Sequence, residues 1–150
     1  MIFEKYRQRQ NHKKIVKHYA QVFEELQCDI LYVPVYASES SQHPLAMILD
    51  NNINYFLGQA LRSKRFTGHL TEYLWYIPKK FKGIGSICFF GVGPKERLNL
   101  TIFQSILNQA TQLDGFRTHA ETSAQATYTK KQYVIMPNID GQRNRLLKIT

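Results

Sequence analysis

The sequence predicts a single α/β domain in which a mixed β-sheet is flanked by helices. Its length of 150 residues fits one domain with a substantial core. No internal repeat and no Pro/Gly-rich linker divides the chain. Segments with the composition of buried strands alternate with segments of helical periodicity. Such alternation is typical of layered α/β domains.

The first half of the chain contains one ambiguous segment and one clear strand. Residues 13–26 place apolar side chains at helical spacing, but KIVKHYAQVF also fits a first strand that ends at a turn, and both alternatives stay open. DILYVPVY (29–36) is a continuous β-branched and aromatic run, which predicts a strand buried on both faces. After the loop ASESSQHP, Pro44 suits the first turn of a helix. NINYFLGQALRSKRF (52–66) is expected to continue that helix.

The second half begins with two strands joined by a basic connection. HLTEYLWYIP (69–78) and SICFFGVG (86–93) have strand composition, and KKFKGIG between them predicts a hairpin connection. LNLTIFQSILNQATQL has helical periodicity that ends near Asp114 and Gly115. A polar, weakly patterned stretch follows. QYVIMPN (132–138) predicts a last strand, and GQRNRLLKIT a short basic tail.

Gly91 and Gly93 form a Gly-x-Gly turn between a strand and a helix. A dinucleotide fingerprint needs G-x-G-x-x-G, but the third position holds Glu96, whose carboxylate repels phosphate. Pro94 removes one of the backbone amides that a phosphate would use. The sequence therefore favours a strand end followed by the start of a helix.

Net charge is the unusual bulk property of the chain. The formal value is +9, and six of the 20 basic residues fall within the first 17 positions. Residues 1–12 are expected to form a basic arm that orders on a partner, and residues 13–150 a single domain. The surplus favours nucleic acid, anionic lipid or an acidic protein partner, with a merely solvated surface as the alternative. The expected anion or nucleic-acid contacts are Arg62, Lys64, Arg65, Lys79, Lys80, Lys82, Lys95 and Arg97.

No catalytic, cofactor-binding or metal-binding residue is expected. The five histidines are isolated, and Ser38, Ser40 and Ser41 lack the G-x-S-x-G context of a hydrolase. Cys28 and Cys88 fit two buried thiols in a reducing compartment. A cytoplasmic location is expected, with a mitochondrial address as the alternative. The longest apolar runs are too short to cross a bilayer, so no membrane partner is expected.

The order of these segments resembles the N-terminal domain of the leucine (cytosol) aminopeptidases. In that family a buried strand is followed by a helix, a GALxxALxxxxFxGKxGE-type segment and a RVLLVGLGKxxxLTxxxxRxAxG-type strand, turn and helix. The resemblance covers about residues 13–113 and implies a macro-domain-like three-layer sandwich with a mixed central sheet. The matching positions are Asp29, Leu57, Gly58, Leu61, Phe66, Gly68, Gly91, Gly93, Lys95, Glu96 and Leu98.

The departures from the family bear on function. In the family, the two-metal chemistry resides in a separate C-terminal domain with an NTDAEGRL-type signature. This sequence lacks that signature, and the four Asp and seven Glu that it contains are scattered. The resemblance thus implies a non-catalytic binding or assembly module that contacts a protein or itself. DNA binding through the basic surface is one alternative, and a piece of a split or truncated aminopeptidase is another. ADP-ribose is not expected, because the glycine-rich loop of macro domains that bind it is missing.

Overall fold

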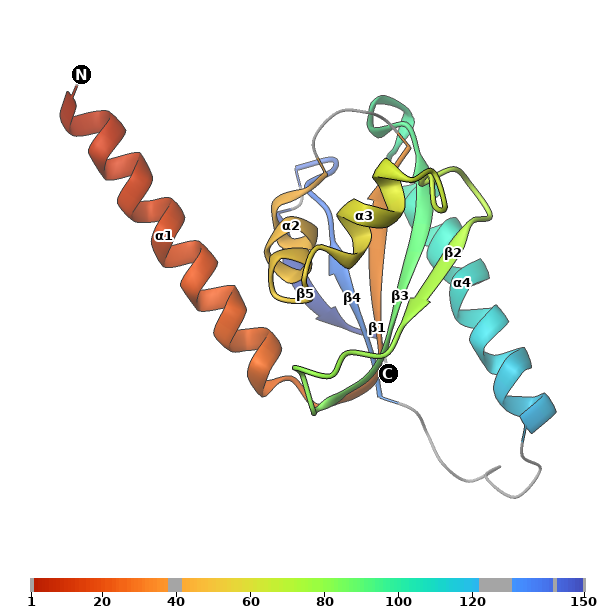
Figure 1. Ribbon diagram of the computed structural model, residues 1–150. Helices are drawn as coiled ribbons and strands as arrows, with labels where there is room; N and C mark the ends of the chain where they lie inside the picture. The colour runs from red at the N-terminus through yellow and green to blue at the C-terminus, as the bar shows by residue number, and fades with distance from the viewer. Residues whose placement is uncertain (1, 38–41, 122–130, 142, 150) are drawn as a thin grey trace.

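The structure, a computed structural model, describes residues 2–37, 42–121, 131–141 and 143–149 (Figure 1). Its elements are α1 (Ile2–Glu25), β1 (Cys28–Tyr36), α2 (Pro44–Asn51), α3 (Phe56–Arg62), β2 (Tyr73–Tyr76), β3 (Ile84–Gly93), the 3-10 turn η1 (Lys95–Arg97), α4 (Leu100–Glu121), β4 (Gln132–Met136) and β5 (Arg145–Lys148). Ser38, Ser40 and Ser41 of the predicted loop lie outside the described residues, as does segment 122–130 of the polar stretch.

The five strands found among the described residues form one mixed sheet in the order β2-β3-β1-β4-β5. Strands β3 and β4 pair with β1 in parallel, whereas β2 and β5 join the two edges antiparallel. Helices α2 and α3 cover one face and α4 covers the other (Figure 1). The predicted α/β class, with a mixed sheet in the middle of three layers, is confirmed.

Strand β1 lies at the centre and supplies side chains to both halves of the core. Leu31, Val33 and Val35 belong to the cluster under α2 and α3. Ile30 and Tyr32 belong to the cluster under α4. Side chains alternate between the faces of a strand, so a strand buried on both faces needs an unbroken apolar run. This is the arrangement predicted from DILYVPVY.

Three predicted boundaries are wrong. The helix expected through residues 52–66 breaks after α2, because Asn54 and Tyr55 both adopt a left-handed φ of 58° before α3 begins. Helix α4 does not end near Asp114 but continues to Glu121. The expected basic tail contains β5, which pairs antiparallel with β4 along the sheet edge.

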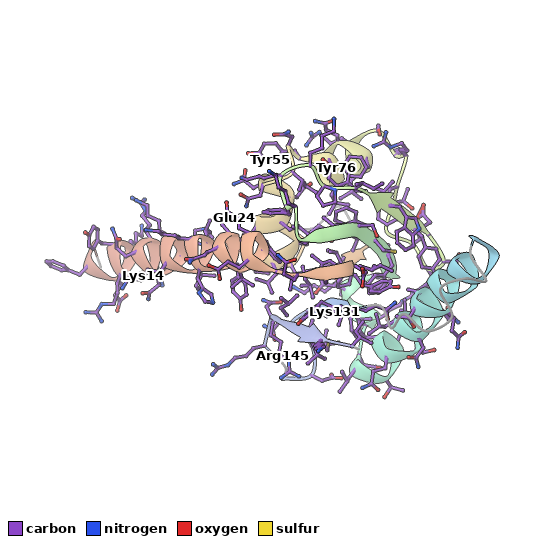
Figure 2. All side chains as sticks on the ribbon, turned by 90° about the horizontal axis from the view of Figure 1, so that it is seen from below. Lys14, Glu24, Tyr55, Tyr76, Lys131 and Arg145 are labelled. Carbon is purple, nitrogen blue, oxygen red and sulfur yellow. The ribbon has the colours of Figure 1, made fainter. Side chains whose placement is uncertain are left out.

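Residues 13–25, whose pattern fitted either a helix or a strand, belong to helix α1. The same helix includes residues 2–12, which were expected to form a separate arm, and it has no break at residue 13. Val16, Tyr19 and Phe23 pack against the core, and their spacing places them on one side of a helix. Residues 3–9 and 11–15 are exposed. The N-terminal part of α1 therefore projects from the body, as Figures 1 and 2 both show. Within the described part of the chain, no helix has the length and apolar character needed to span a membrane.

Candidate functional site

The Gly-x-Gly turn at the carboxyl end of β3 connects this strand to η1, and its backbone amides bond within the fold. The Gly91 amide donates to the Glu72 carbonyl oxygen, and the Gly93 amide donates to the Gly68 carbonyl oxygen, each at 3.0 Å. A phosphate cradle would need these amides for its ligand. Gly93 also has a φ of 77°, a conformation that favours glycine. The turn is thus the end of a strand, as interpreted from the sequence, and it leads into η1 before α4 begins.

Thr67, His69 and Glu72 meet in the loop that packs on these glycines. The Glu72 carboxylate accepts hydrogen bonds from the Thr67 hydroxyl and from the His69 amide, and Thr67 Oγ1 also lies next to His69 Nδ1. Burial acts to raise the pKa of Glu72, but the hydrogen bonds it accepts lower that pKa overall. A nucleophile relay would place the imidazole between hydroxyl and carboxylate. Here the hydroxyl lies in the middle, so the cluster fastens the loop.

His43 is buried and holds the start of α2. Its Nε2 donates to the Pro34 carbonyl oxygen at 2.8 Å, which leaves Nδ1 to accept from the Ala46 amide at 3.3 Å. Burial lowers the pKa of His43 to about 4, the Pro34 hydrogen bond opposes this, and the charge of Lys95 adds to the lowering. The imidazole is therefore neutral near pH 7 and acts as a helix cap. His43 therefore serves the fold.

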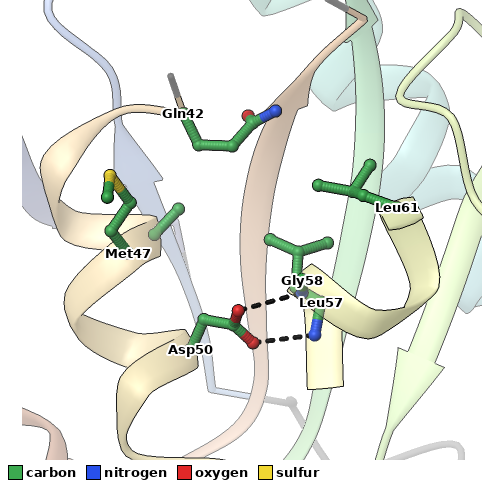
Figure 3. A pocket seen from close by; sticks show the side chains of 7 residues that line it. Gln42, Met47, Asp50, Leu57, Gly58 and Leu61 are labelled. Carbon is green, nitrogen blue, oxygen red and sulfur yellow. Dashed lines mark hydrogen bonds between the residues drawn. The ribbon is translucent and has the colours of Figure 1, made fainter. Parts of the chain in front are cut away.

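A hollow of about 190 Å³ lies between α2 and α3 (Figure 3). Its wall holds Asp50, whose carboxylate oxygens accept from the Leu57 amide at 2.7 Å and the Gly58 amide at 2.9 Å. Burial raises the pKa of Asp50, although these hydrogen bonds counteract the rise. The Gln42 side chain is likewise engaged, with the amide and carbonyl of Tyr36. Both polar groups serve the fold, and the rest of the lining is mostly apolar.

Within the described residues, no group of three or more His, Cys, Asp or Glu side chains is placed to hold a metal ion. Cys28 and Cys88 are buried thiols, as expected. Burial, and after it the charge of Asp29, raises the pKa of Cys28 to about 12. A thiol with so high a pKa stays protonated and is a poor nucleophile or metal ligand.

The eight cations expected as anion contacts are all exposed, but they do not form one patch. Arg65 lies over the Phe56 ring, and Lys80 donates to Asn52 at the end of α2, so two of the groups border the α2–α3 layer. Lys95 instead lies over the Tyr36 ring, at the opposite end of the sheet. The ten residues of β3 separate it from the connection that carries Lys79, Lys80 and Lys82. The structure thus splits the predicted surface.

Helix α1 carries the densest charge in the described chain, and the sequence did not show that this charge lies on a projecting helix. Its six cations are all exposed: Lys5, Arg7, Arg9, Lys13, Lys14 and Lys17. Phe3 and Tyr6 on the same segment are 82% and 63% exposed. The last turn holds Glu24 and Glu25 and no base.

Apart from Glu4 in the first turn, this charge order opposes the helix dipole, whose positive end lies at the N-terminus. Lys5, Arg9, Lys13 and Lys17 also follow one another at i, i+4, a spacing at which like charges repel. The cations therefore cost α1 stability in the free chain. The charge of these cations adds to that of the positive end of the helix dipole. An anion bound to this segment would therefore be attracted by the cations and by the dipole.

Comparison with known proteins finds a solved structure that is similar to part of this chain. No protein-family model matches the chain, and no curated protein matches its sequence. Among solved structures, a mutant of tomato leucine aminopeptidase shares 21% sequence identity over 59% of this chain and 18% of its own chain, with a TM-score of 0.44. The chain therefore resembles part of that protein and spans less than a fifth of it. The α/β assignment rests on the sheet described above.

Proposed function

We propose that this chain is a non-catalytic binding or assembly module that acts by contact with another macromolecule. The observation that carries the proposal is the exposed part of α1. The C-terminal end of this helix packs against the core, and its N-terminal part projects from the body. A solitary helix of about a dozen residues is marginal in water, and a partner that covers it would stabilise it. Exposed Phe3 and Tyr6 supply apolar area for such a contact.

A protein partner or a second copy of the chain is the first form of the proposal. We expect the native complex, isolated gently from its own cells, to have a mass well above the 17.6 kDa of one chain. Chemical crosslinks within that complex should fall on α1. A single 17.6 kDa species with no crosslink on α1 would contradict the proposal. Metal-dependent peptide hydrolysis by the pure chain would overturn its non-catalytic part.

A catalytic partner subunit is a special case of the same proposal. The chain would then be the N-terminal-like piece of a split aminopeptidase whose two-metal domain is a separate polypeptide. This version expects that a subunit with such a metal site co-purifies with the chain. It also expects peptidase activity in the complex and none in the isolated chain.

Nucleic-acid binding is the second candidate, and the net charge of +9 favours it. Neutralising Lys79, Lys80 and Lys82 to glutamine tests whether the connection between β2 and β3 takes part. If it does, affinity for DNA falls and the salt dependence of binding becomes shallower by about 0.9 for each phosphate that the variant no longer neutralises. Unchanged affinity and slope would remove this connection from the interface.

A further inference from the structure

We propose that the projecting part of α1, residues 3–15, enters the major groove of double-stranded DNA. The inference rests on the proposed binding function and names the chemistry of the partner. It places the contact on a different surface from the cations first expected to bind nucleic acid. Three features of α1 support it: the placement of its cations, the side chains between them, and its freedom from the body.

The cations of residues 3–15 lie on two flanks of one broad side of the helix, and Lys17 lies between these flanks. With 3.6 residues per turn, Arg7 and Lys14 are seven positions apart and share one side. Arg9 and Lys13 are four positions apart and lie on another side. A flat anionic surface contacts the middle of such a side, where residues 3–10 place no cation. A helix in a groove meets phosphates on both walls, which requires cations on both flanks.

Over residues 3–10, the side chains that lie between these flanks form an uncharged stripe. Phe3, Tyr6 and Gln10 have the i, i+3, i+7 spacing that places them on one helix face. Gln10 can pair with an adenine edge, and the aromatic rings can contact thymine methyl groups. By the same helical geometry, the stripe points well away from the side on which Val16 and Phe23 meet the core. The body therefore does not obstruct it.

The dimensions favour duplex DNA over duplex RNA. An α-helix with side chains is about 10–12 Å across, and the major groove of B-DNA is about 12 Å wide. Residues 3–15 extend for about 20 Å, enough to follow the groove across several base pairs. The major groove of A-form RNA is too deep and narrow for side chains to read.

The test measures fluorescence anisotropy of a labelled, mixed-sequence DNA duplex as the full chain is titrated between about 50 mM and about 200 mM salt. The flank variant carries Arg9→Gln, Lys13→Gln and Lys14→Gln. The matched control carries Lys79→Gln, Lys80→Gln and Lys82→Gln, which removes the same charge from the body. A third variant, Tyr6→Ala with Gln10→Ala, changes the stripe and leaves the charge unchanged.

We expect the flank variant to bind about tenfold to a hundredfold more weakly and to reduce the salt slope by about 2.7, because three phosphates are no longer neutralised. The control should bind nearly as the wild type does. The stripe variant should lose affinity at an unchanged slope. Circular dichroism verifies folding, and the flank variant should keep or gain helix because it relieves like-charge repulsion.

Several results would overturn the inference. Equal losses in the flank and control variants would indicate diffuse attraction, and a loss in the control alone would place the contact on the body. Equal competition by duplex RNA would rule out the groove. If the wild type does not bind the duplex at about 50 mM salt, the DNA partner is wrong. The binding function itself would then still stand or fall on the mass and crosslinks of the native complex.

Discussion

Replacing Gly91 with alanine is expected to lower the free energy of unfolding by about 3 kcal/mol or more. An added Cβ would collide with the His69 carbonyl oxygen and would lie 2.6 Å from the carbonyl carbon and oxygen of Gly68. These are backbone atoms, and the hydrogen bond between Gly93 and Gly68 holds them in place. Overpacking against fixed backbone cannot be relieved by rotating a side chain.

Urea unfolding, followed by the fluorescence of the single tryptophan, measures this loss. The control is Gly141→Ala. Gly141 has a φ of 78°, but an added Cβ there would have no atom within 4 Å. That variant should lose only the roughly 1–2 kcal/mol that a left-handed conformation costs a residue with a Cβ. Equal losses of unfolding free energy in the two variants would show that the backbone of Gly68 and His69 is not in close contact with Gly91.

The stability of the chain is expected to fall as the pH drops from about 6.5 towards about 4. Burial lowers the pKa of His43 to about 4 in the folded chain, from its ordinary value of 6.5. The unfolded chain therefore takes up this proton at a higher pH than the folded chain, and acid favours unfolding. The loss should approach about 1.4 kcal/mol per pH unit and reach about 3 kcal/mol near pH 4.

Urea titrations at a series of pH values, compared with those of His43→Gln, isolate this effect. The variant should be less stable at pH 7, because it disturbs the contacts with Pro34 and Ala46. The difference between the two proteins should narrow as the pH falls, since only the wild type has the buried imidazole to protonate. A difference that stays constant with pH would contradict the assignment of this acid sensitivity to His43.

The fold was predictable where a local pattern decided it. Strands β1, β3 and β4 are apolar runs whose burial on both faces shows in composition alone. The break between α2 and α3 was not predictable, because no Gly or Pro marks it and the Asp50 carboxylate holds it from seven residues away. Strand β5 was missed because RLLK is a mostly exposed edge strand of four residues.

The candidate site was predictable in its charge but not in its shape. The cations of the first 17 positions are visible in the sequence. Their placement on a projecting helix depends on where Val16, Tyr19 and Phe23 find the core, which is a tertiary contact. The eight cations were expected as one surface, although the strand predicted over residues 86–93 already separates Lys95 from Lys80, as β3 does in the structure.

The central claim is that α1 is the surface through which this chain binds its partner. Amide hydrogen exchange, measured on the full chain with and without DNA duplex, tests it at the level of segments. In the free chain, amides of residues 3–12 should exchange faster than those of residues 16–25, which are anchored to the core. Adding duplex should slow exchange in residues 3–15 and leave β1 and β3 unchanged. Protection that appears instead in residues 77–83, with α1 unaffected, would contradict the claim.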